Sequence, residues 1–191
     1  MKPIYTVALA GAAALALVLG AGLNAPLVAK EMTKMVGGAP MYPSKNIVQN
    51  AIHSKDHTTL VAAVKAAGLV KTLESPGPFT VFAPTNAAFA KLPKGTVKAL
   101  LEPKNKGKLK SILTYHVVPG RLTTHDLMEK VKAGHGKAML KTVEGDDLTI
   151  EKKGAHLWIV DGKGDKARIT VSNVMQSNGV IQVINKVMLP G

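Results

Sequence analysis

The chain has 191 residues, of which 46% are hydrophobic and 19% charged, and its formal net charge is +13. This length suits one domain with a tail, and the hydrophobic content argues against intrinsic disorder. Because the chain contains no cysteine, its sequence excludes a disulfide scaffold, thiol catalysis and cysteine-ligated zinc or iron–sulfur clusters.

Lysine supplies almost all of the positive charge, since only Arg121 and Arg168 are arginines. Nucleic-acid-binding proteins usually rely on forked arginines and on exposed aromatic rings. Here the lysines are dispersed, with one cluster at Lys104, Lys106, Lys108 and Lys110. The pattern predicts a soluble, lysine-coated surface with weak attraction to acidic polymers, and no nucleic-acid partner.

The N-terminal segment 1–29 has the pattern of a secretory signal peptide. Lys2 is followed by a long apolar run rich in alanine, and then by small residues. Ala29 and Ala21 are the two candidate cleavage points. The alternative is an uncleaved membrane anchor, because the run approaches the ~20 residues that span a bilayer. Residues 30–45 show no periodicity and are predicted to be a flexible leader.

The next part of the chain is mostly helical by its apolar periodicity. A helix at 58–67 is expected to begin after Asp56 as its N-cap and to end at Gly68. A buried strand is predicted at 79–83. The other predicted helices are 46–54, 70–74, a short one from about 86 to 92, 95–101 and 106–114.

From Tyr115 onward the apolar residues alternate, and turn sequences separate the runs. The predicted strands are 115–118, 138–143, 148–152, 157–160, 167–171 and 180–184. Helices first and strands later indicate a single α+β domain over residues 46–190.

Three segments, taken together and in this order, resemble the fasciclin family. They are GPFTVFAPTNAAF at 77–89, LTYHVVPG at 113–120 and SNGVIQVIN at 177–185. The resemblance implies an α+β fold with a β-sandwich-like wedge and a helical layer. It also implies export to the periplasm, the cell surface or the medium, and a role in adhesion or binding rather than catalysis.

The family resemblance makes Tyr115 and His116 the candidate binding residues, since this pair matches the family's central motif. The competing interpretation is a structural histidine, half-buried on a strand and braced by Tyr115. The sequence departs from the family where Gln182 and Asn185 replace a common histidine and aspartate. Residues 171–175 also carry no acidic side chain, so we assign no integrin-type activity.

No catalytic, metal-binding or cofactor site is predicted. His53 and His57 have the four-residue spacing of a metal pair, but a helix break falls between them and no third ligand is near in sequence. Asp161 and Asp165 lie in a glycine-rich turn, where aspartate is favoured by turn geometry.

Two functions remain open from the sequence. The first is an exported adhesion or interaction protein that binds a partner protein or an envelope or matrix polysaccharide. The second is a carrier for a hydrophobic small molecule such as a lipid. Its groove would lie between the helical layer and the sheet, lined by residues such as Leu60, Val64, Phe82 and Phe89.

Overall fold

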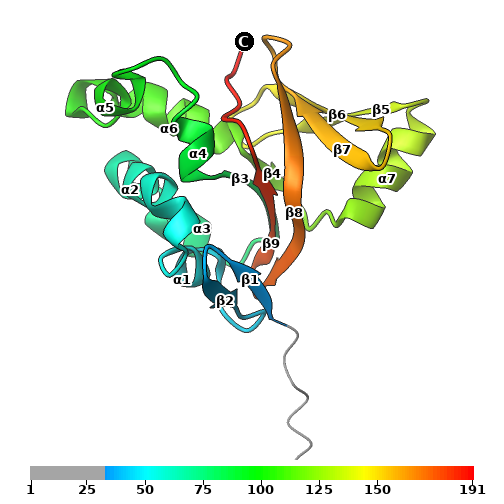
Figure 1. Cartoon of the computed structure of the whole chain (residues 1–191), viewed down its shortest axis with the longest axis horizontal. Helices are drawn as coiled ribbons and strands as arrows, with labels where there is room; N and C mark the ends of the chain where they lie inside the picture. The colour runs from blue at the N-terminus through cyan, green and yellow to red at the C-terminus, as the bar shows by residue number, and fades with distance from the viewer. Residues whose placement is uncertain (1–32) are drawn as a thin grey trace, which may run out of the picture. The chain divides into compact units, whose positions relative to one another are not determined.

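The structure is a computed structural model that describes residues 33–191 (Figure 1). The predicted signal peptide lies outside the described residues. Within residues 33–191, no helix has both the length and the apolar character needed to cross a membrane.

The helices fall into two groups on either side of the sheet. Helices α1 to α6 lie on one side, and α7 packs alone against the far strands (Figure 1). The bounds are α1 Ile47–Ala51, α2 Thr58–Ala67, α3 Val70–Glu74, α4 Asn86–Phe89, α5 Thr96–Leu100, α6 Lys106–Tyr115 and α7 Thr124–Ala133. Short 3-10 turns, η1 Lys55–His57 and η2 Pro103–Asn105, precede α2 and α6.

One seven-stranded sheet runs in the order β4-β3-β9-β8-β7-β6-β5. Strands β3 and β9 are paired in parallel, whereas every other neighbouring pair is antiparallel. The strands are β3 Phe79–Pro84, β4 Val117–Pro119, β5 Lys137–Lys141, β6 Asp147–Lys153, β7 His156–Val160, β8 Lys166–Gln176 and β9 Gly179–Ile184.

The sheet bends until its two outer ends come close together. Just beyond β5, the backbone N–H of Val143 donates to the carbonyl of Val117 in β4 at 2.8 Å. Strand β8 carries two register shifts against β9, between Ile169 and Val174. Such irregularities let one long strand serve both halves of a bent sheet.

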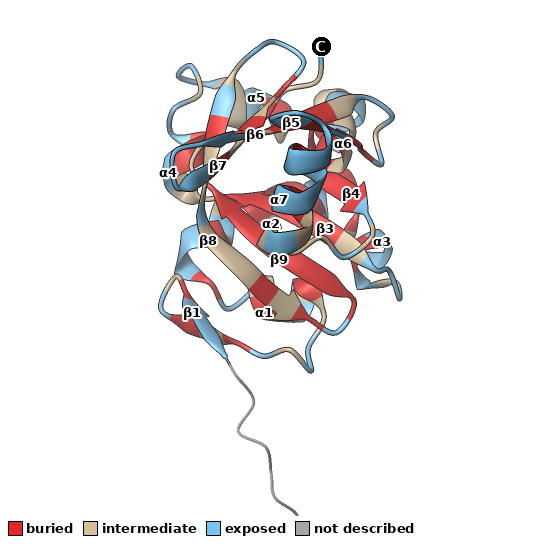
Figure 2. Cartoon of the chain, turned by 90° about the vertical axis from the view of Figure 1, so that its right-hand side faces the viewer, coloured by how far each residue is buried: buried red, intermediate tan, exposed pale blue. Residues whose placement is uncertain are grey.

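The bent sheet divides the buried residues into two cores. One lies between α1–α6 and the strands β3 and β9, and includes Leu60, Val64 and Ile181. The other lies inside the bend and includes Phe82, Ile150 and Ile184. Figure 2 shows both the buried central strands and the exposed outer face of α7. Phe82 and Ile184 belong to this inner core, while their strand neighbours Val81 and Val183 belong to the other, as β-strand alternation requires.

Most predicted elements are confirmed, and the fold is the expected α+β arrangement of a single domain. All six predicted helices and the strand at 79–83 form within a few residues of their expected limits. The strands expected between 138 and 184 also form, and β8 extends further, to Gln176. The expected N-cap of α2 is wrong, because Asp56 lies in η1 and makes no side-chain cap.

Two further expectations are corrected. Residues 34–41 are not irregular: β1 Lys34–Val36 and β2 Ala39–Met41 form a hairpin, because Val36, Ala39 and Met41 are apolar and pack into the core. Helix α7 is the second correction, because no element was expected at Thr124–Ala133. Thr123 and Asp126 form a capping box at its start, and Leu127 and Val131 are its buried stripe.

Candidate functional site

Tyr115 is the last residue of α6 rather than the first of a strand, and it is completely buried. Its hydroxyl donates to the carbonyl of Asp147 at 2.9 Å and accepts the N–H of Gly162 at 3.0 Å. The ring belongs to the core inside the bent sheet. Burial raises the pKa of this hydroxyl, with a smaller opposing effect from the Gly162 hydrogen bond.

His116 follows as the C-cap of α6 and is only 2% exposed, rather than half-buried on a strand. Its Nε2 lies 3.0 Å from the backbone nitrogen of Met188 and accepts that N–H. Nδ1 therefore carries the ring proton and donates to the carbonyl of Ile112 at 2.8 Å. Burial lowers the pKa of His116 to about 4, against the smaller opposing effects of Ile112 and Asp161.

All polar side-chain atoms of Tyr115 and His116 thus form hydrogen bonds inside the domain. The pair joins α6 to the β7–β8 loop and to the C-terminal segment, which supports the structural interpretation of the motif. Direct binding of a partner by either side chain stays a prediction, and their enclosed positions give it no support.

A largely apolar cavity lies between α1–α3 and the sheet, with a volume of about 100 Å³. Of the residues predicted to line such a groove, Leu60, Val64 and Phe82 do so, whereas Phe89 is buried nearby without lining it. Val61, Val70 and Thr72 are lining residues that retain exposed surface. The cavity therefore reaches the molecular surface beside α2 and α3.

His57 is the lining residue of most chemical interest. It is 3% exposed, and its Nδ1 lies 2.9 Å from Oγ of the equally buried Ser54. Its Nε2 is buried and has no hydrogen-bond partner. Burial lowers the pKa of His57, only partly opposed by the nearby Ala83 carbonyl and the Asp56 charge. The ring is therefore neutral at neutral pH.

The spacing of His53 and His57 does not produce a metal site. His53 is exposed while His57 faces the interior, so the two rings are not presented to one ion. Across residues 33–191, no cluster of three or more histidine or acidic side chains is arranged to hold a metal.

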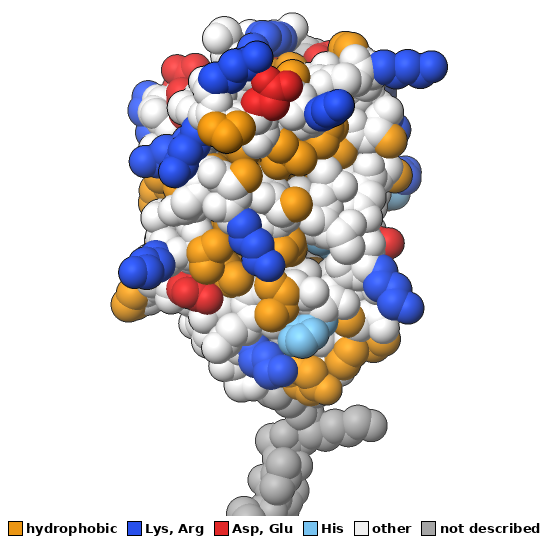
Figure 3. All heavy atoms as spheres, turned by 90° about the vertical axis from the view of Figure 1, so that its left-hand side faces the viewer, with side chains coloured by type: hydrophobic (Ala, Val, Ile, Leu, Met, Phe, Trp, Pro, Cys, Tyr) orange, Lys and Arg blue, Asp and Glu red, His pale blue; other side chains and the backbone are white. Residues whose placement is uncertain are grey.

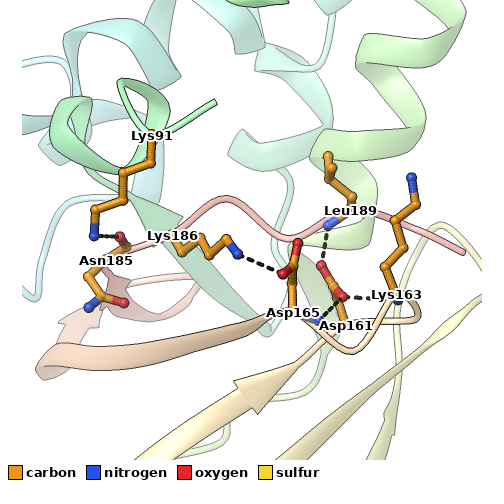
Figure 4. Close-up of polar contacts among 7 residues, drawn as sticks. All are labelled: Lys91, Asp161, Lys163, Asp165, Asn185, Lys186 and Leu189. Carbon is orange, nitrogen blue, oxygen red and sulfur yellow. Dashed lines mark hydrogen bonds and ion pairs between the residues drawn. The ribbon is translucent and has the colours of Figure 1, made fainter. Parts of the chain in front are cut away.

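Asp161 and Asp165 lie in the β7–β8 turn, as expected, and fix the C-terminal segment (Figure 4). Asp161 accepts the N–H groups of Lys163 and Asp165 through Oδ1, and that of Leu189 through Oδ2, at 2.9 to 3.0 Å. Lys186 reaches Oδ1 of Asp165 at 2.7 Å. The Asp161 carboxylate, which is only 6% exposed, holds three backbone N–H groups in place, whereas that of Asp165 pairs with the Lys186 side chain.

Gln182, one of the departures from the family pattern, forms a buried polar link that the sequence did not reveal. Its Oε1 accepts the N–H of Asn173 at 2.9 Å, and its Nε2 donates to the carbonyl of Leu122 at 3.0 Å. Asn173 in turn accepts the N–H of Thr124 at the start of α7. A glutamine of β9 thus helps to hold the residues at the start of α7 in place.

The positive charge gathers on the helical side of the domain. Between Ile47 and Tyr115 the acidic residues are Asp56, Glu74 and Glu102, and every lysine is exposed. Those lysines are Lys55, Lys65, Lys71, Lys91, Lys94, Lys98, Lys104, Lys106, Lys108 and Lys110. Among them, one ion pair forms, between Lys104 and Glu102 at 2.9 Å. Figure 3 shows lysine side chains spread over this face, with apolar surface between them.

Comparison with known proteins gives one consistent result. A family model described as a fasciclin domain matches residues 55–190. The protein sll1483 of Synechocystis is 44% identical over 177 residues, covering 90% of this chain and 91% of that protein. The immunogenic protein MPB70 of Mycobacterium bovis is 34% identical over 145 residues, covering 73% of this chain and 66% of MPB70.

A solved structure shows the same fold. The domain pair of the insect cell adhesion molecule fasciclin I aligns with a TM-score of 0.68 at 20% sequence identity. The alignment covers 78% of this chain and 52% of that one.

Proposed function

The chain belongs to the fasciclin family, and from this membership we propose that it is an exported, non-catalytic adhesion or interaction protein. It binds a partner protein or an envelope or matrix polysaccharide that presents negative charge. Export to the periplasm, the cell surface or the medium is proposed from the signal-like sequence of residues 1–29. Any direct attachment to a membrane is through that segment left uncleaved.

The observation that supports this proposal is the distribution of charge over the two halves of the domain. Between Ile47 and Tyr115 the chain has ten lysines and only three acidic residues. From His116 to Gly191 the chain has 11 cationic and eight acidic residues. The helical face is therefore the strongly basic one, and it attracts an acidic partner over about one Debye length in physiological salt.

The test is salt-dependent binding to a charged polymer. We expect the protein to bind heparin, a sulfated polysaccharide, and to release it as salt rises, with no binding to neutral dextran. The variant Lys94→Glu/Lys98→Glu/Lys108→Glu should lose most of this binding. The variant Lys152→Glu/Lys153→Glu/Lys163→Glu makes the same charge change on the strand side. If both variants lost heparin binding equally, the helical face would not be the specific binding surface.

A second function is favoured by a separate observation, the apolar cavity under α1–α3. A carrier for a hydrophobic small molecule requires an interior space walled by apolar side chains and open to solvent at one side. The cavity of about 100 Å³ has both properties. Native mass spectrometry of the protein from its own host tests this function. A reproducible added mass that extracts into organic solvent is the expected result for a carrier.

A further inference from the structure

We propose that the cavity under α1–α3 binds the end of the alkyl chain of a fatty acid, and that the carboxylate of this molecule lies at the opening, beside the ammonium group of Lys65. The inference rests on the carrier function proposed above and specifies the chemistry of its ligand.

The cavity is long and thin. Along β3 its lining residues run from Phe79 to Ala83, a distance of about 13 Å at the usual rise of a strand. Its volume of about 100 Å³ is spread over this length. An apolar cavity of roughly 150 Å³ is known to hold benzene, which has six carbons. By the same measure, this smaller and longer space suits about four carbons of an extended chain, and the rest of the chain lies in the opening beside α2 and α3.

The enclosed part of the cavity presents almost no polar surface to a ligand. His57 is held by Ser54 and the β1–β2 hairpin behind it, and its Nε2 is closed off near the carbonyl of Ala83. His116, the other histidine of the wall, has both ring nitrogens paired. The rest of the enclosed wall is apolar and includes Val36, Met41, Leu60, Val64, Leu73, Val81 and Ile181. A polar atom placed there would lose its hydration without gaining a hydrogen bond, so the enclosed part of the ligand is hydrocarbon.

Lys65 gives the opening of the cavity its charge. It is a lining residue on α2 and is exposed. A lysine in this position borders the apolar wall with its methylene stem and keeps its ammonium group in water. The ion pairs formed between described residues involve other lysines, so this ammonium group is available to a ligand. An anionic head group is attracted to it, and a cationic head group is repelled.

Two neighbouring lysines add to the positive charge around the opening. Lys71 lies between two lining residues of α3. Nζ of Lys106 lies 3.7 Å from the position that a Cβ would occupy at Gly68, the C-cap of α2. Between residues 58 and 101 the sequence contains a single acidic residue, Glu74. The surroundings of Lys65 are therefore positive overall, which favours a carboxylate at the opening over a neutral or cationic group.

The experiment compares octanoate, octanol and octylamine, which share an eight-carbon chain, by NMR titration of the protein at neutral pH, where octylamine is cationic. All three should shift the methyl resonances of the lining residues Val64, Leu73 and Ile181. Octanoate should bind about fivefold more tightly than octylamine, the ratio expected when one charge is reversed beside an exposed lysine. This preference should shrink as salt rises.

Chain length and charge reversal then test the two ends of the ligand separately. From butanoate to hexanoate, each added CH₂ group that becomes buried should tighten binding by up to about fourfold. In Lys65→Glu the preference for octanoate over octylamine should reverse. Lys98→Glu makes the same charge change at an exposed lysine of α5 that does not line the cavity, and it should leave the preference intact.

Each other outcome has a distinct meaning. Binding of none of the three molecules would overturn the carrier function together with this inference. Equal affinities for octanoate and octylamine, or a preference that survives in Lys65→Glu, would keep the carrier function and overturn the role of Lys65. Octanoate binding that shifts no lining methyl group would be attraction to surface lysines alone and would overturn the inference. If Lys65→Glu does not fold, the order of the two affinities and its salt dependence in the unmodified protein still decide.

Discussion

Nε2 of His116 accepts the backbone N–H of Met188 across a separation of 72 residues in the chain. This hydrogen bond is completely buried, and the opposite nitrogen of the same ring holds the last turn of α6. One imidazole therefore connects the helical layer with the C-terminal segment. His116, a candidate binding residue from the sequence, therefore has a structural role.

The first prediction is that His116→Ala destabilises the domain strongly. The change leaves the Met188 N–H and the Ile112 carbonyl without their partner and opens a cavity, at a cost of about 3 kcal/mol. Urea unfolding followed by circular dichroism measures it. His125→Ala, at an exposed position in α7, should change the unfolding free energy by less than about 0.5 kcal/mol. An unchanged stability in His116→Ala would return this residue to the binding candidates.

The second prediction is that the domain loses stability as the pH falls from about 6.5 towards 4. Burial lowers the pKa of His116 from 6.5 to about 4. In this window the unfolded chain binds more protons than the folded one, so acid favours unfolding. The contribution of His116 is present in full above pH 6.5 and is lost by about pH 4, for a total of about 3 kcal/mol.

Unfolding free energies at pH 7.5, 6 and 5 measure this pH dependence. His57, whose pKa burial also lowers, adds a contribution of the same sign. The slope of the unfolding free energy against pH should therefore be smaller in His116→Ala than in the unmodified protein, but it should not fall to zero. A slope that is identical with and without His116 would contradict the prediction.

The third prediction is that Tyr115→Phe lowers the free energy of unfolding by about 1–2 kcal/mol. The ring remains in its core position, but the Gly162 N–H and the Asp147 carbonyl lose the hydroxyl that pairs with them. Tyr42→Phe is the matched control, because Tyr42 is 37% exposed. Denaturation midpoints of the two variants should differ clearly, and equal midpoints would show that the Tyr115 hydroxyl is dispensable.

The fourth prediction is that Asp161→Ala loosens the C-terminal segment more than the rest of the domain. Asp161 accepts three backbone N–H groups, including that of Leu189. Hydrogen exchange at Leu189 should accelerate at least tenfold while amides in β9 change little. Asp165→Ala, which removes a half-exposed ion pair with Lys186, should have a much smaller effect. Uniform acceleration over the whole domain would mean global destabilisation instead.

Local patterns were sufficient to locate most helices and strands. The apolar spacing in residues 58–67 and the glycine at 68 identify α2, and alternation identifies β6 and β7. The motif at 113–120 was found as a motif, yet its conformation was misjudged. Alternating apolar residues from Tyr115 to Val118 suit a strand, but α6 continues through Tyr115 because the helix places that ring in the inner core.

The candidate cavity site was less accessible to sequence analysis. The groove residues Leu60 and Val64 were identified because they lie on one face of a helix. His57 was considered only as half of a metal pair, because nothing in the sequence shows which way its ring points. The contacts that define it come from Ser54, from the β1–β2 hairpin and from the sheet, and such long-range contacts carry no local signature.

The parallel pairing of β3 with β9 determines when the domain can fold during its synthesis. β9 ends at Ile184 and lies between β3 and β8, so the sheet cannot be completed until the chain has been made as far as residue 184. A chain stopped before Gly179 would expose the edges of both neighbouring strands. Assembly is therefore dominated by distant pairings, which makes it slow compared with that of a helical bundle of similar size.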